Sequence, residues 1–355
     1  MNPPAAGHFK GNYRCASWNS QGLLAYNIHK QNAKRNYLAK LLNAHDMVAV
    51  QETHTTTGNA AVVQLPVGTV PLWSHGSRRQ GGIGLILQAA FLRSFAAIAP
   101  DDWEVIEPGH LAILHLRGPA GAMSVVVGYF PSGHRAAGKR QELRQRLHRA
   151  IASKPEVLWI VTGDFNWVTK EADRVDLHNS THSGGGDGAE EIHWHEQVAQ
   201  PAGLRELAQP EFTFRSEDVR SRLDRAYTSH HDADFFAGVF WAAAWPWPSR
   251  NAAGWAVSDH RPITFGFRRP PADGRPPALQ AGVVNHPDFG RRVAKEYHFQ
   301  IKRRVRSGHK LDPMHRLALI KAAMYTVADN MKTVREGAGP LGDDIPATAA
   351  TAFAI

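Results

Sequence analysis

Six short segments, far apart in the sequence, place acidic, amide, phenolic or imidazole side chains beside apolar stretches. They are Ser17-Trp-Asn19, Gln51-Glu-Thr-His54, Gly128-Tyr-Phe-Pro131, Gly163-Asp-Phe-Asn166, Ser221-Arg-Leu-Asp-Arg225 and Ser258-Asp-His260. Ligand sites of α/β proteins form where strand ends converge, so these six segments can meet in one place. Turn chemistry alone also explains any single one of them, because acids and amides commonly follow strands.

Four of the segments carry a carboxylate, namely Glu52, Asp164, Asp224 and Asp259. Four carboxylates in one cleft repel each other strongly unless a cation or an imidazolium lies among them. The single cysteine, Cys15, excludes an internal disulfide and a multi-cysteine zinc site. Oxygen donors without thiolates favour a hard ion, so the sequence predicts a divalent metal such as Mg²⁺, held by one or two of these carboxylates.

The apolar stretches around these segments predict an α/β protein. Runs rich in Val, Ile and Leu indicate strands at residues 13–18, 47–50, 83–87, 111–116, 124–129, 157–161 and 263–267. Helical periodicity predicts helices at 34–42 and 139–151, and in the second helix Leu143, Leu147 and Ile151 form one apolar face. Strands that alternate with helices are typical of a sheet buried under helices.

Composition predicts the organisation of the 355-residue chain. Residues 269–280 are rich in proline and glycine and predict a linker between a large α/β domain, 1–268, and a tail, 281–355. Two helices are expected in the tail, at 287–306 and 313–334. The first ten residues show no signal-peptide pattern, and no apolar stretch approaches the ~20 residues of a membrane span. We therefore expect a soluble, intracellular protein without a membrane partner.

The net charge of +9 is concentrated in the tail, where residues 269–355 hold 14 basic and 8 acidic side chains. Eight basic residues fall within 291–310, against the single acid Glu296. Such a stripe fits a polyanion such as nucleic acid. A solvated helix face explains it equally well, because charged runs are common on such faces.

Two further groups of residues suggest functions that the sequence leaves open. Four tryptophans lie between the last two segments and fit either base stacking or core packing; they are Trp241, Trp245, Trp247 and Trp255. Four histidines lie in or beside the glycine-rich residues 176–191, where a second metal can be imagined, but this composition predicts a surface loop. They are His178, His182, His193 and His195.

In chain order, the series WN, QET, GYFP, GDFN, SRLDR and SDHRP resembles the endonuclease/exonuclease/phosphatase superfamily across roughly residues 12–268. That superfamily includes apurinic DNA endonucleases, nuclease I-type DNases, inositol polyphosphate phosphatases and sphingomyelinases. The sequences of these motifs most closely resemble the endonuclease domain of non-LTR (LINE-type) retrotransposons. Residues 281–355 resemble the connector that follows that domain. The resemblance implies a four-layer α/β sandwich, two packed mixed sheets flanked by helices, with the site at one end.

The resemblance also implies how the metal is held. Glu52 is then the principal Mg²⁺ ligand, with Mn²⁺ as a substitute, and Asn19 orients the site beside it. Asp259 lies near the metal and the leaving oxygen. One position departs from the apurinic endonucleases, which carry an acid two residues after the asparagine, where this chain has Gln21. A neutral amide makes repair of abasic sites less expected than relaxed or sequence-biased nicking.

The remaining matched residues are implied to act on the phosphate and the attacking water. Asp164 orients or deprotonates the water. Asn166 and Tyr129 donate hydrogen bonds to phosphate oxygens. His260 stabilises charge on the phosphorane and Asp224 orients His260, a pairing with the logic of the serine-protease triad. His54 and Thr213 occupy positions that lie near the substrate in the retrotransposon branch.

We therefore expect a Mg²⁺-dependent DNA endonuclease that nicks a backbone phosphodiester by in-line attack of water, as in target-primed retrotransposition. DNA is the expected partner, RNA stays open as a second partner of the tail, and no obligate protein partner is indicated. DNA nicking implies a nuclear location. Two alternatives remain: a phosphodiesterase or phosphatase acting on an inositol phosphate or phospholipid headgroup, and a catalytically silent nucleic-acid-binding module.

Overall fold

The computed structural model describes residues 7–24, 27–77, 81–184, 188–231, 234, 238–248, 256–269, 279, 281–306 and 313–337. The chain forms two compact units, one of residues 1–230 with 244–265 and the other of residues 231–243 with 266–355. The predicted linker, 269–280, lies outside the described residues except at positions 269 and 279.

Within the described residues, the strands form two six-stranded sheets and one three-stranded sheet. The first sheet has the order β14-β15-β1-β2-β4-β3. Its strands are β1 (Tyr13–Asn19), β2 (Met47–Gln51), β3 (Thr69–Ser74), β4 (Ile83–Gln88), β14 (Val239–Ala244) and β15 (Ile263–Arg268). The pair β1–β2 is parallel, whereas β2–β4 and β3–β4 are antiparallel, so this sheet is mixed.

The second sheet has the order β10-β13-β8-β7-β6-β5. Its strands are β5 (Trp103–Glu107), β6 (Leu111–Gly118), β7 (Gly121–Tyr129), β8 (Leu158–Asp164), β10 (Arg205–Glu206) and β13 (Asp224–Thr228). Only β7 and β8 pair in parallel among these described strands, so this sheet is also mixed. The small sheet consists of β9 (Arg174–Asp176), β11 (Phe214–Arg215) and β12 (Val219–Ser221).

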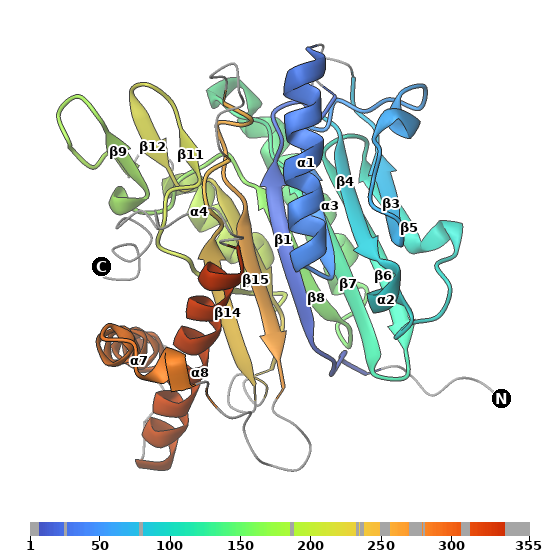
Figure 1. Cartoon of the computed structure of the whole chain (residues 1–355). Helices are drawn as coiled ribbons and strands as arrows, with labels where there is room; N and C mark the ends of the chain where they lie inside the picture. Colours follow the sequence, from blue (N-terminus) through green and yellow to red (C-terminus); the bar gives the residue numbers. More distant parts are fainter. Residues whose placement is uncertain are drawn as a thin grey trace. The chain divides into compact units, whose positions relative to one another are not determined.

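Helices cover the outer faces of the two large sheets, which pack on each other through β1, β2, β4, β7 and β8 (Figure 1). The main helices are α1 (Ile28–Ala44), α3 (Ala137–Ala152) and α4 (Gly188–Trp194), which continues into a π-helical turn, His195–Ala199. The short elements are α2 (Ala89–Leu92), η1 (Ala60–Val62), η2 (Pro100–Asp102), η3 (His134–Ala136) and η4 (Glu171–Asp173). The predicted four-layer α/β sandwich is confirmed.

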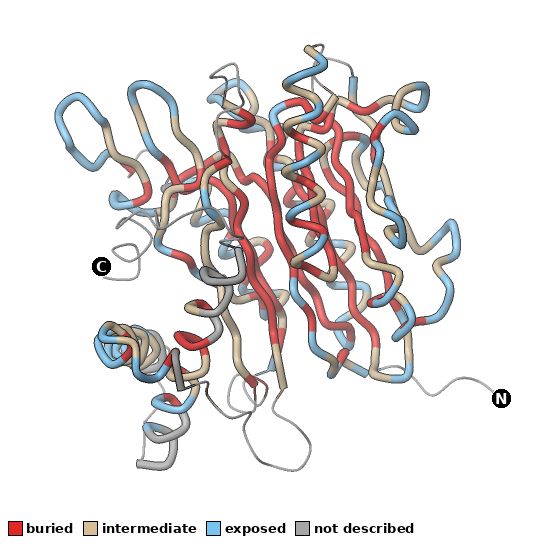
Figure 2. The backbone as a smooth tube through the Cα atoms, in the orientation of Figure 1, coloured by how far each residue is buried: buried red, intermediate tan, exposed pale blue. Residues whose placement is uncertain are grey.

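The helix starts and the core follow from the sequence pattern. Asn27 caps α1, because its side-chain oxygen accepts a hydrogen bond from the backbone N–H of Lys30 at 3.1 Å. On α3, the predicted apolar face of Leu143, Leu147 and Ile151 is buried against the second sheet. The central strands of both sheets are buried along most of their length, as Figure 2 shows, because each sheet has a helix layer on one face and the other sheet on the opposite face, whereas the edge strands β3, β5, β10 and β14 are mostly only partly buried.

All seven predicted strands and both predicted helices of this α/β region are confirmed, but the loop predicted at 176–191 is partly wrong. Its last four residues belong to α4. Arg140 holds this helix through Glu190 at 2.7 Å, Arg144 also binds Glu190, and Trp194 is buried in the core. These long-range contacts, rather than local periodicity, stabilise the helix. His178 bonds the exposed Asp218 at 2.8 Å, so its ring serves a surface ion pair.

The second unit contains α6 (Ala281–Val284), α7 (Phe289–Arg306) and α8 (Pro313–Gly337), which confirms the two helices predicted in the tail. Val283 of α6, Phe289 of α7 and Val327 with Ala328 of α8 form a small apolar core. No helix in the described part of the chain has the length and apolarity needed to cross a membrane.

A buried ion-pair network fixes β13, the strand that begins at Asp224. The carboxylate of Asp173 binds Arg222 at 2.8 Å and Arg225 at 3.3 Å, and Glu206 binds Arg222 at 2.5 Å. Burial alone raises the pKa of Asp173, but its two arginine partners hold that pKa well below its usual range. The two arginines therefore anchor β13 on both sides of Leu223 and Asp224.

We predict that Asp173→Asn lowers the free energy of unfolding by about 3–5 kcal/mol, because it leaves two buried guanidinium groups short of a negative partner. Urea unfolding monitored by circular dichroism measures this loss. The control is Glu171→Gln, which neutralises an exposed carboxylate two residues away and is expected to change stability by less than about 0.5 kcal/mol. Equal effects of the two substitutions would show that the network does not stabilise the fold.

Candidate active site

Strand register brings the predicted site residues to one end of each sheet. In the second sheet, Tyr129 lies opposite Asp164 across the parallel pair β7–β8, and Asp224 lies opposite Asp164 across the antiparallel pair β8–β13. In the first sheet, Asn19 at the end of β1 lies opposite the residue that precedes Glu52. The site residues therefore lie at neighbouring strand ends. In the second sheet these are the ends of β7, β8 and β13, and in the first sheet the ends of β1 and β2.

Asn19 connects the two sheets through a single amide nitrogen. Its Nδ2 donates to Oε1 of Glu52 at 2.9 Å and to Oδ2 of Asp164 at 2.8 Å. Its side-chain oxygen accepts a hydrogen bond from the backbone N–H of Gln21 at 3.0 Å. Burial, together with the nearby carboxylates of Glu52 and Asp164, raises the pKa of the Tyr129 hydroxyl. Every polar atom of the Asn19 side chain is thus used to hold the site together.

Asp164 is buried and accepts hydrogen bonds at both oxygens. The backbone N–H of Asn166 donates to Oδ1 at 2.9 Å, and Nδ2 of Asn166 donates to Oδ2 at 3.1 Å. Burial raises the pKa of Asp164, whereas the positive charge of His260 opposes that rise. A carboxylate with a raised pKa is a better proton acceptor than an exposed aspartate, which suits the general-base role.

His260 and Asp224 form a buried pair beside this carboxylate. Nδ1 of His260 lies 2.8 Å from Oδ2 of Asp224, and Nε2 lies 4.0 Å from Oδ2 of Asp164. Burial opposes the charged imidazolium, but the charge and hydrogen bond of Asp224, with Asp164 and Asp259, raise the pKa of His260 to about 10. His260 is therefore an imidazolium at neutral pH and offsets the negative charge around it.

Thr213 has a different place from the one that the resemblance implies. It is fully buried, and its hydroxyl oxygen accepts hydrogen bonds from the backbone N–H groups of Leu223 and Asp224, both at 3.0 Å. Thr213 thus positions the start of β13 and does not line the pocket. His54 is partly exposed, and its Nε2 lies 4.0 Å from Glu52, so it lies at the margin of the site.

Backbone strain is concentrated in these segments. Four of the five non-glycine residues with positive φ in the described chain are Gln21 (49°), Glu52 (48°), His54 (54°) and Asn166 (56°), at or just beyond the ends of β1, β2 and β8. A left-handed conformation costs a non-glycine residue about 1–2 kcal/mol, and it persists where surrounding contacts enforce it. Strain of this kind is typical of functional sites.

A buried lysine that sequence analysis missed enforces one of these conformations. Lys34 of α1 is fully buried, and its Nζ donates to the carbonyl oxygens of Ser20 at 2.6 Å, Gln21 at 2.5 Å and Gly22 at 2.8 Å. Burial and the neighbouring Lys30 lower the pKa of Lys34 to about 7, against the opposing charges of Asp259 and Glu52. A helix lysine has no sequence signal that distinguishes this position from an exposed one.

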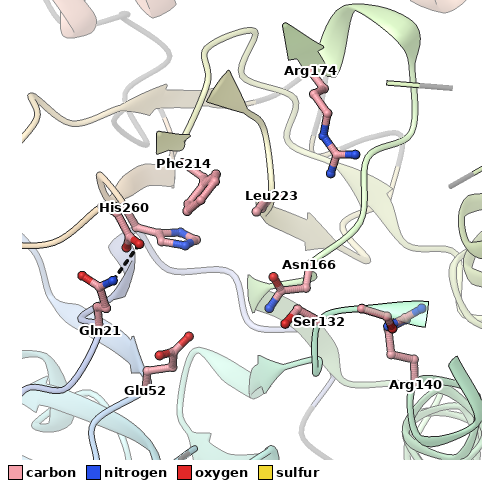
Figure 3. A pocket seen from close by; sticks show the side chains of 11 residues that line it. Gln21, Glu52, Ser132, Arg140, Asn166, Arg174, Phe214, Leu223 and His260 are labelled. Carbon is pink, nitrogen blue, oxygen red and sulfur yellow. Dashed lines mark hydrogen bonds between the residues drawn. The ribbon is translucent and has the colours of Figure 1, made fainter. Parts of the chain in front are cut away.

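These segments surround a pocket of about 450 Å³ (Figure 3). Four predicted residues line it, namely Glu52, Asn166, Asp259 and His260. The lining residues that the sequence did not single out as site residues are Gln21, Ser132, Gly133, Arg140, Arg174, Phe214 and Leu223. Arg174 comes from β9, and its guanidinium lies on the side of the pocket opposite Glu52 in Figure 3. The pocket thus combines a carboxylate side with a side that carries arginine.

The donor set on the carboxylate side fits a hard divalent cation. Oδ1 of Asp259 is buried and has no hydrogen-bond partner among the described residues, while Oδ2 accepts a hydrogen bond from Nε2 of Gln21 at 2.7 Å. Glu52 lines the same pocket. An unpaired buried carboxylate oxygen is costly unless a cation binds it. Carboxylate and amide oxygens without sulfur or unpaired imidazole are typical of Mg²⁺ or Ca²⁺ rather than of zinc.

A second grouping also has converging ligand atoms. Atoms of Asp164, Asp224 and His260 lie within 4.8 Å of one another, and among the described residues this is the cluster of histidines and acids that could hold an ion. His260 and Asp224 already bind each other, and Asp164 accepts hydrogen bonds from Asn19 and Asn166. Most polar atoms of this cluster are thus paired, which suits moving a proton or stabilising charge, but Oδ1 of Asp224, like Oδ1 of Asp259, is buried without a hydrogen-bond partner among the described residues.

The tryptophans near the last motif have protein partners. Trp245 packs edge-on against the ring of His45, with the ring centroids 5.2 Å apart. Trp247 stacks with Arg215 at 4.4 Å and Arg261 at 5.0 Å. Trp255 lies outside the described residues. These contacts favour the anchoring role over base stacking for Trp245 and Trp247.

Comparisons with known proteins place this arrangement in context. A model of the endonuclease/exonuclease/phosphatase family matches residues 16–260. AP endonuclease LMAP from Leishmania major has a TM-score of 0.55 and 18% identity, covering 73% of this chain and 89% of that chain. D. rerio TDP2 complexed with single-strand DNA product has a TM-score of 0.51 and 16% identity, covering 73% and 100%. An AP endonuclease from Archaeoglobus fulgidus has a TM-score of 0.51 and 14% identity, covering 71% and 98%. No curated protein sequence matches the chain.

We predict that Lys34→Met speeds amide hydrogen exchange in residues 20–24 and lowers the free energy of unfolding by at least about 2 kcal/mol, because three carbonyl groups lose their donor. Hydrogen–deuterium exchange with mass spectrometry measures the first effect, and urea unfolding the second. Lys40→Met, at an exposed position of the same helix, is the matched control. Unchanged exchange in residues 20–24 would rule out the clamp.

We predict that the His260 imidazole is protonated at pH 8 in the metal-free protein and neutral there in Asp224→Asn. Because its pKa rises from 6.5 to about 10, the pair's contribution to stability is fully present below about pH 6.5 and lost as pH rises through about 10. Imidazole ¹⁵N chemical shifts report the protonation state. Asp218→Asn removes the exposed partner of His178 and should leave His260 unchanged. A neutral His260 at pH 8 in the unsubstituted protein would contradict this assignment.

Proposed function

The chain belongs to the endonuclease/exonuclease/phosphatase family, and on this basis we propose that it is a Mg²⁺-dependent phosphodiesterase that nicks DNA. The observation that carries the proposal is the buried assembly of Asn19, Asp164, Asp224 and His260 beside a pocket whose other carboxylates, Glu52 and Asp259, retain coordinating capacity. This combination supplies a base, a charge-stabilising imidazolium and a metal-compatible donor set at one place.

Different residues of the pocket and of the cluster beside it act on the attacking water, on the phosphate and on the metal. Asp164, with its raised pKa, orients the attacking water and accepts its proton. His260 presents the protonated Nε2 to the negative charge that builds on the phosphate, while Asp224 fixes the ring through Nδ1. Asn166 lies on the pocket wall, where its amide would exchange its hydrogen bond to Asp164 or to the backbone oxygen of Phe130 for one to a phosphate oxygen, without adding charge. A divalent ion held by Glu52 and Asp259 would act as a Lewis acid on the phosphoryl group.

The surroundings of the pocket favour a polymeric phosphodiester. Arg174 offers a guanidinium across the pocket from the carboxylates, and Phe214 presents an aromatic ring whose centroid lies 5.1 Å from that of His260. Guanidinium groups and aromatic rings are the groups that nucleic-acid sites use for phosphates and bases. The similar structures include AP endonucleases and TDP2 with a single-strand DNA product, which supports DNA as the substrate class.

Gln21 bears on the kind of DNA that is cleaved. Its amide donates to Asp259 instead of adding a further carboxylate to the donor set. We infer relaxed or sequence-biased nicking rather than repair of abasic sites, as in the target-primed retrotransposition of LINE-type elements. A nick of this type leaves a 3′-hydroxyl suited to priming, and such an activity requires access to the nucleus.

We predict that the purified chain relaxes supercoiled plasmid with Mg²⁺ and not with EDTA, and that Mn²⁺ can substitute for Mg²⁺. Glu52→Gln, Asp164→Asn and His260→Gln are each expected to lower the nicking rate by at least about 100-fold, because each removes a group that acts in the transition state. Agarose-gel separation of supercoiled and relaxed circles measures the rate. Glu171→Gln and His178→Gln are matched controls at exposed positions.

Assays of the same proteins on other substrates distinguish the DNA-nicking enzyme from a headgroup phosphodiesterase and from a silent binding module. Hydrolysis of an inositol phosphate or phospholipid headgroup by a protein that leaves plasmid intact would replace DNA as the substrate and keep the chemistry. Plasmid binding without hydrolysis of either substrate would establish a silent binding module. Nicking that survives all three substitutions would refute the assigned site, and circular dichroism of each variant shows that the fold is retained.

A further inference from the structure

Helix α7 of the second unit has two faces of opposite character. Phe289 and Val293 pack with α6 and α8 in the small apolar core. Four basic side chains, spaced by four, three and four residues, lie on the opposite face, within an arc of about 60° at roughly 100° per residue. These side chains form the α7 basic face, and they are Arg291, Lys295, His298 and Lys302.

The α7 basic face is accessible over most of its length. Arg291, His298 and Lys302 are exposed, whereas Lys295 between them is half-buried and its Nζ atom is buried. At about 1.5 Å per residue, the face extends about 16 Å along the helix. This length corresponds to about five base pairs of one strand of a duplex, at roughly 3.4 Å each.

The positive charge of this face is poorly balanced. Arg291 bonds Asp288 at 2.7 Å, but this ion pair is exposed and weak. The Nζ atom of Lys295 is buried without a hydrogen-bond partner among the described residues, and burial and the neighbouring Arg291 lower the pKa of Lys295, so this side chain has to turn outward to contact an anion. Glu296, the single acid of the helix, accepts a hydrogen bond from Gln300. Like charges close together on one helix face repel each other, and an anion bound beside them lowers that repulsion.

We propose that the α7 basic face binds the phosphate backbone of duplex DNA. A row of cations on a rigid helix matches a row of phosphates by charge and spacing, and such contacts bind any sequence. The choice of DNA rests on the proposed function, because a nicking enzyme gains residence time on its substrate from contacts outside the pocket. The electrostatic argument itself depends only on the residues of α7.

The test measures binding of a short fluorescent duplex by fluorescence anisotropy, with the full chain, in EDTA and across a range of NaCl concentrations. The triple variant Arg291→Gln, Lys295→Gln and Lys302→Gln should bind at least tenfold more weakly at low salt. Its slope of log affinity against log salt should fall by about 2.7, which is three phosphate contacts at about 0.9 each. Glutamine has a helix propensity close to that of lysine and arginine, so α7 is expected to stay folded.

The control is Lys40→Gln, Arg93→Gln and Arg149→Gln, which removes the same charge from exposed positions outside α7. An equal loss in the control would overturn the proposal, because it would reduce the effect to net charge. An unchanged slope in the α7 variant, or a loss restricted to single-stranded RNA, would also overturn it. Hydrolysis of a small phosphodiester with Mg²⁺ is measured separately, so failure of the catalytic proposal and failure of the α7 proposal give different results.

Discussion

The mutual repulsion of four carboxylates is the constraint on which the rest of the site depends. These carboxylates come from both large sheets and the segments after them: Glu52 and Asp259 line the pocket, and Asp164 and Asp224 are buried beside it. Such charges separate unless positive partners and hydrogen-bond donors hold them. The chain uses three kinds of partner: amide donors from Asn19, Asn166 and Gln21, the imidazolium of His260, and the buried ammonium of Lys34. The amide of Asn19 links the two sheets, because it donates hydrogen bonds to Glu52 after β2 and to Asp164 at the end of β8.

The strained backbone at the strand ends follows from this constraint. A strand that continued in extended form past Asn19 or Glu52 would alternate its side chains away from the pocket. Left-handed residues instead turn the chain sharply at Gln21, Glu52 and Asn166, so that consecutive polar groups face the same space. At about 1–2 kcal/mol for each residue, these turns need enforcement, and the three carbonyl contacts of Lys34 supply it for the first of them. Packing of α1 on the first sheet therefore contributes directly to the geometry of the site.

The sequence predicted the features that local patterns carry. Apolar runs located seven strands, the spacing of Leu143, Leu147 and Ile151 located α3, and the motifs located four of the residues that line the pocket. It did not predict features that depend on long-range contacts. The strand β13 contains Asp224 and Arg225, and charges of this kind lie in a buried strand only because Asp173 and Glu206 pair with the arginines. Likewise, nothing in the motif around Thr213 distinguishes a hydroxyl that meets substrate from one that accepts two backbone N–H groups.

The internal pairing of charges also explains why the catalytic region has little positive charge left for a polyanion. Residues 1–268 hold 27 basic and 24 acidic side chains, and three arginines in or near the site are paired with carboxylates. Arg140 pairs with Glu190, and Arg222 and Arg225 pair with Asp173. These guanidinium groups stabilise the fold, and their fields are cancelled at close range by the paired carboxylates. A pocket with several carboxylates attracts a long phosphate chain less strongly than unpaired basic side chains do, and the excess of basic side chains lies in residues 269–355.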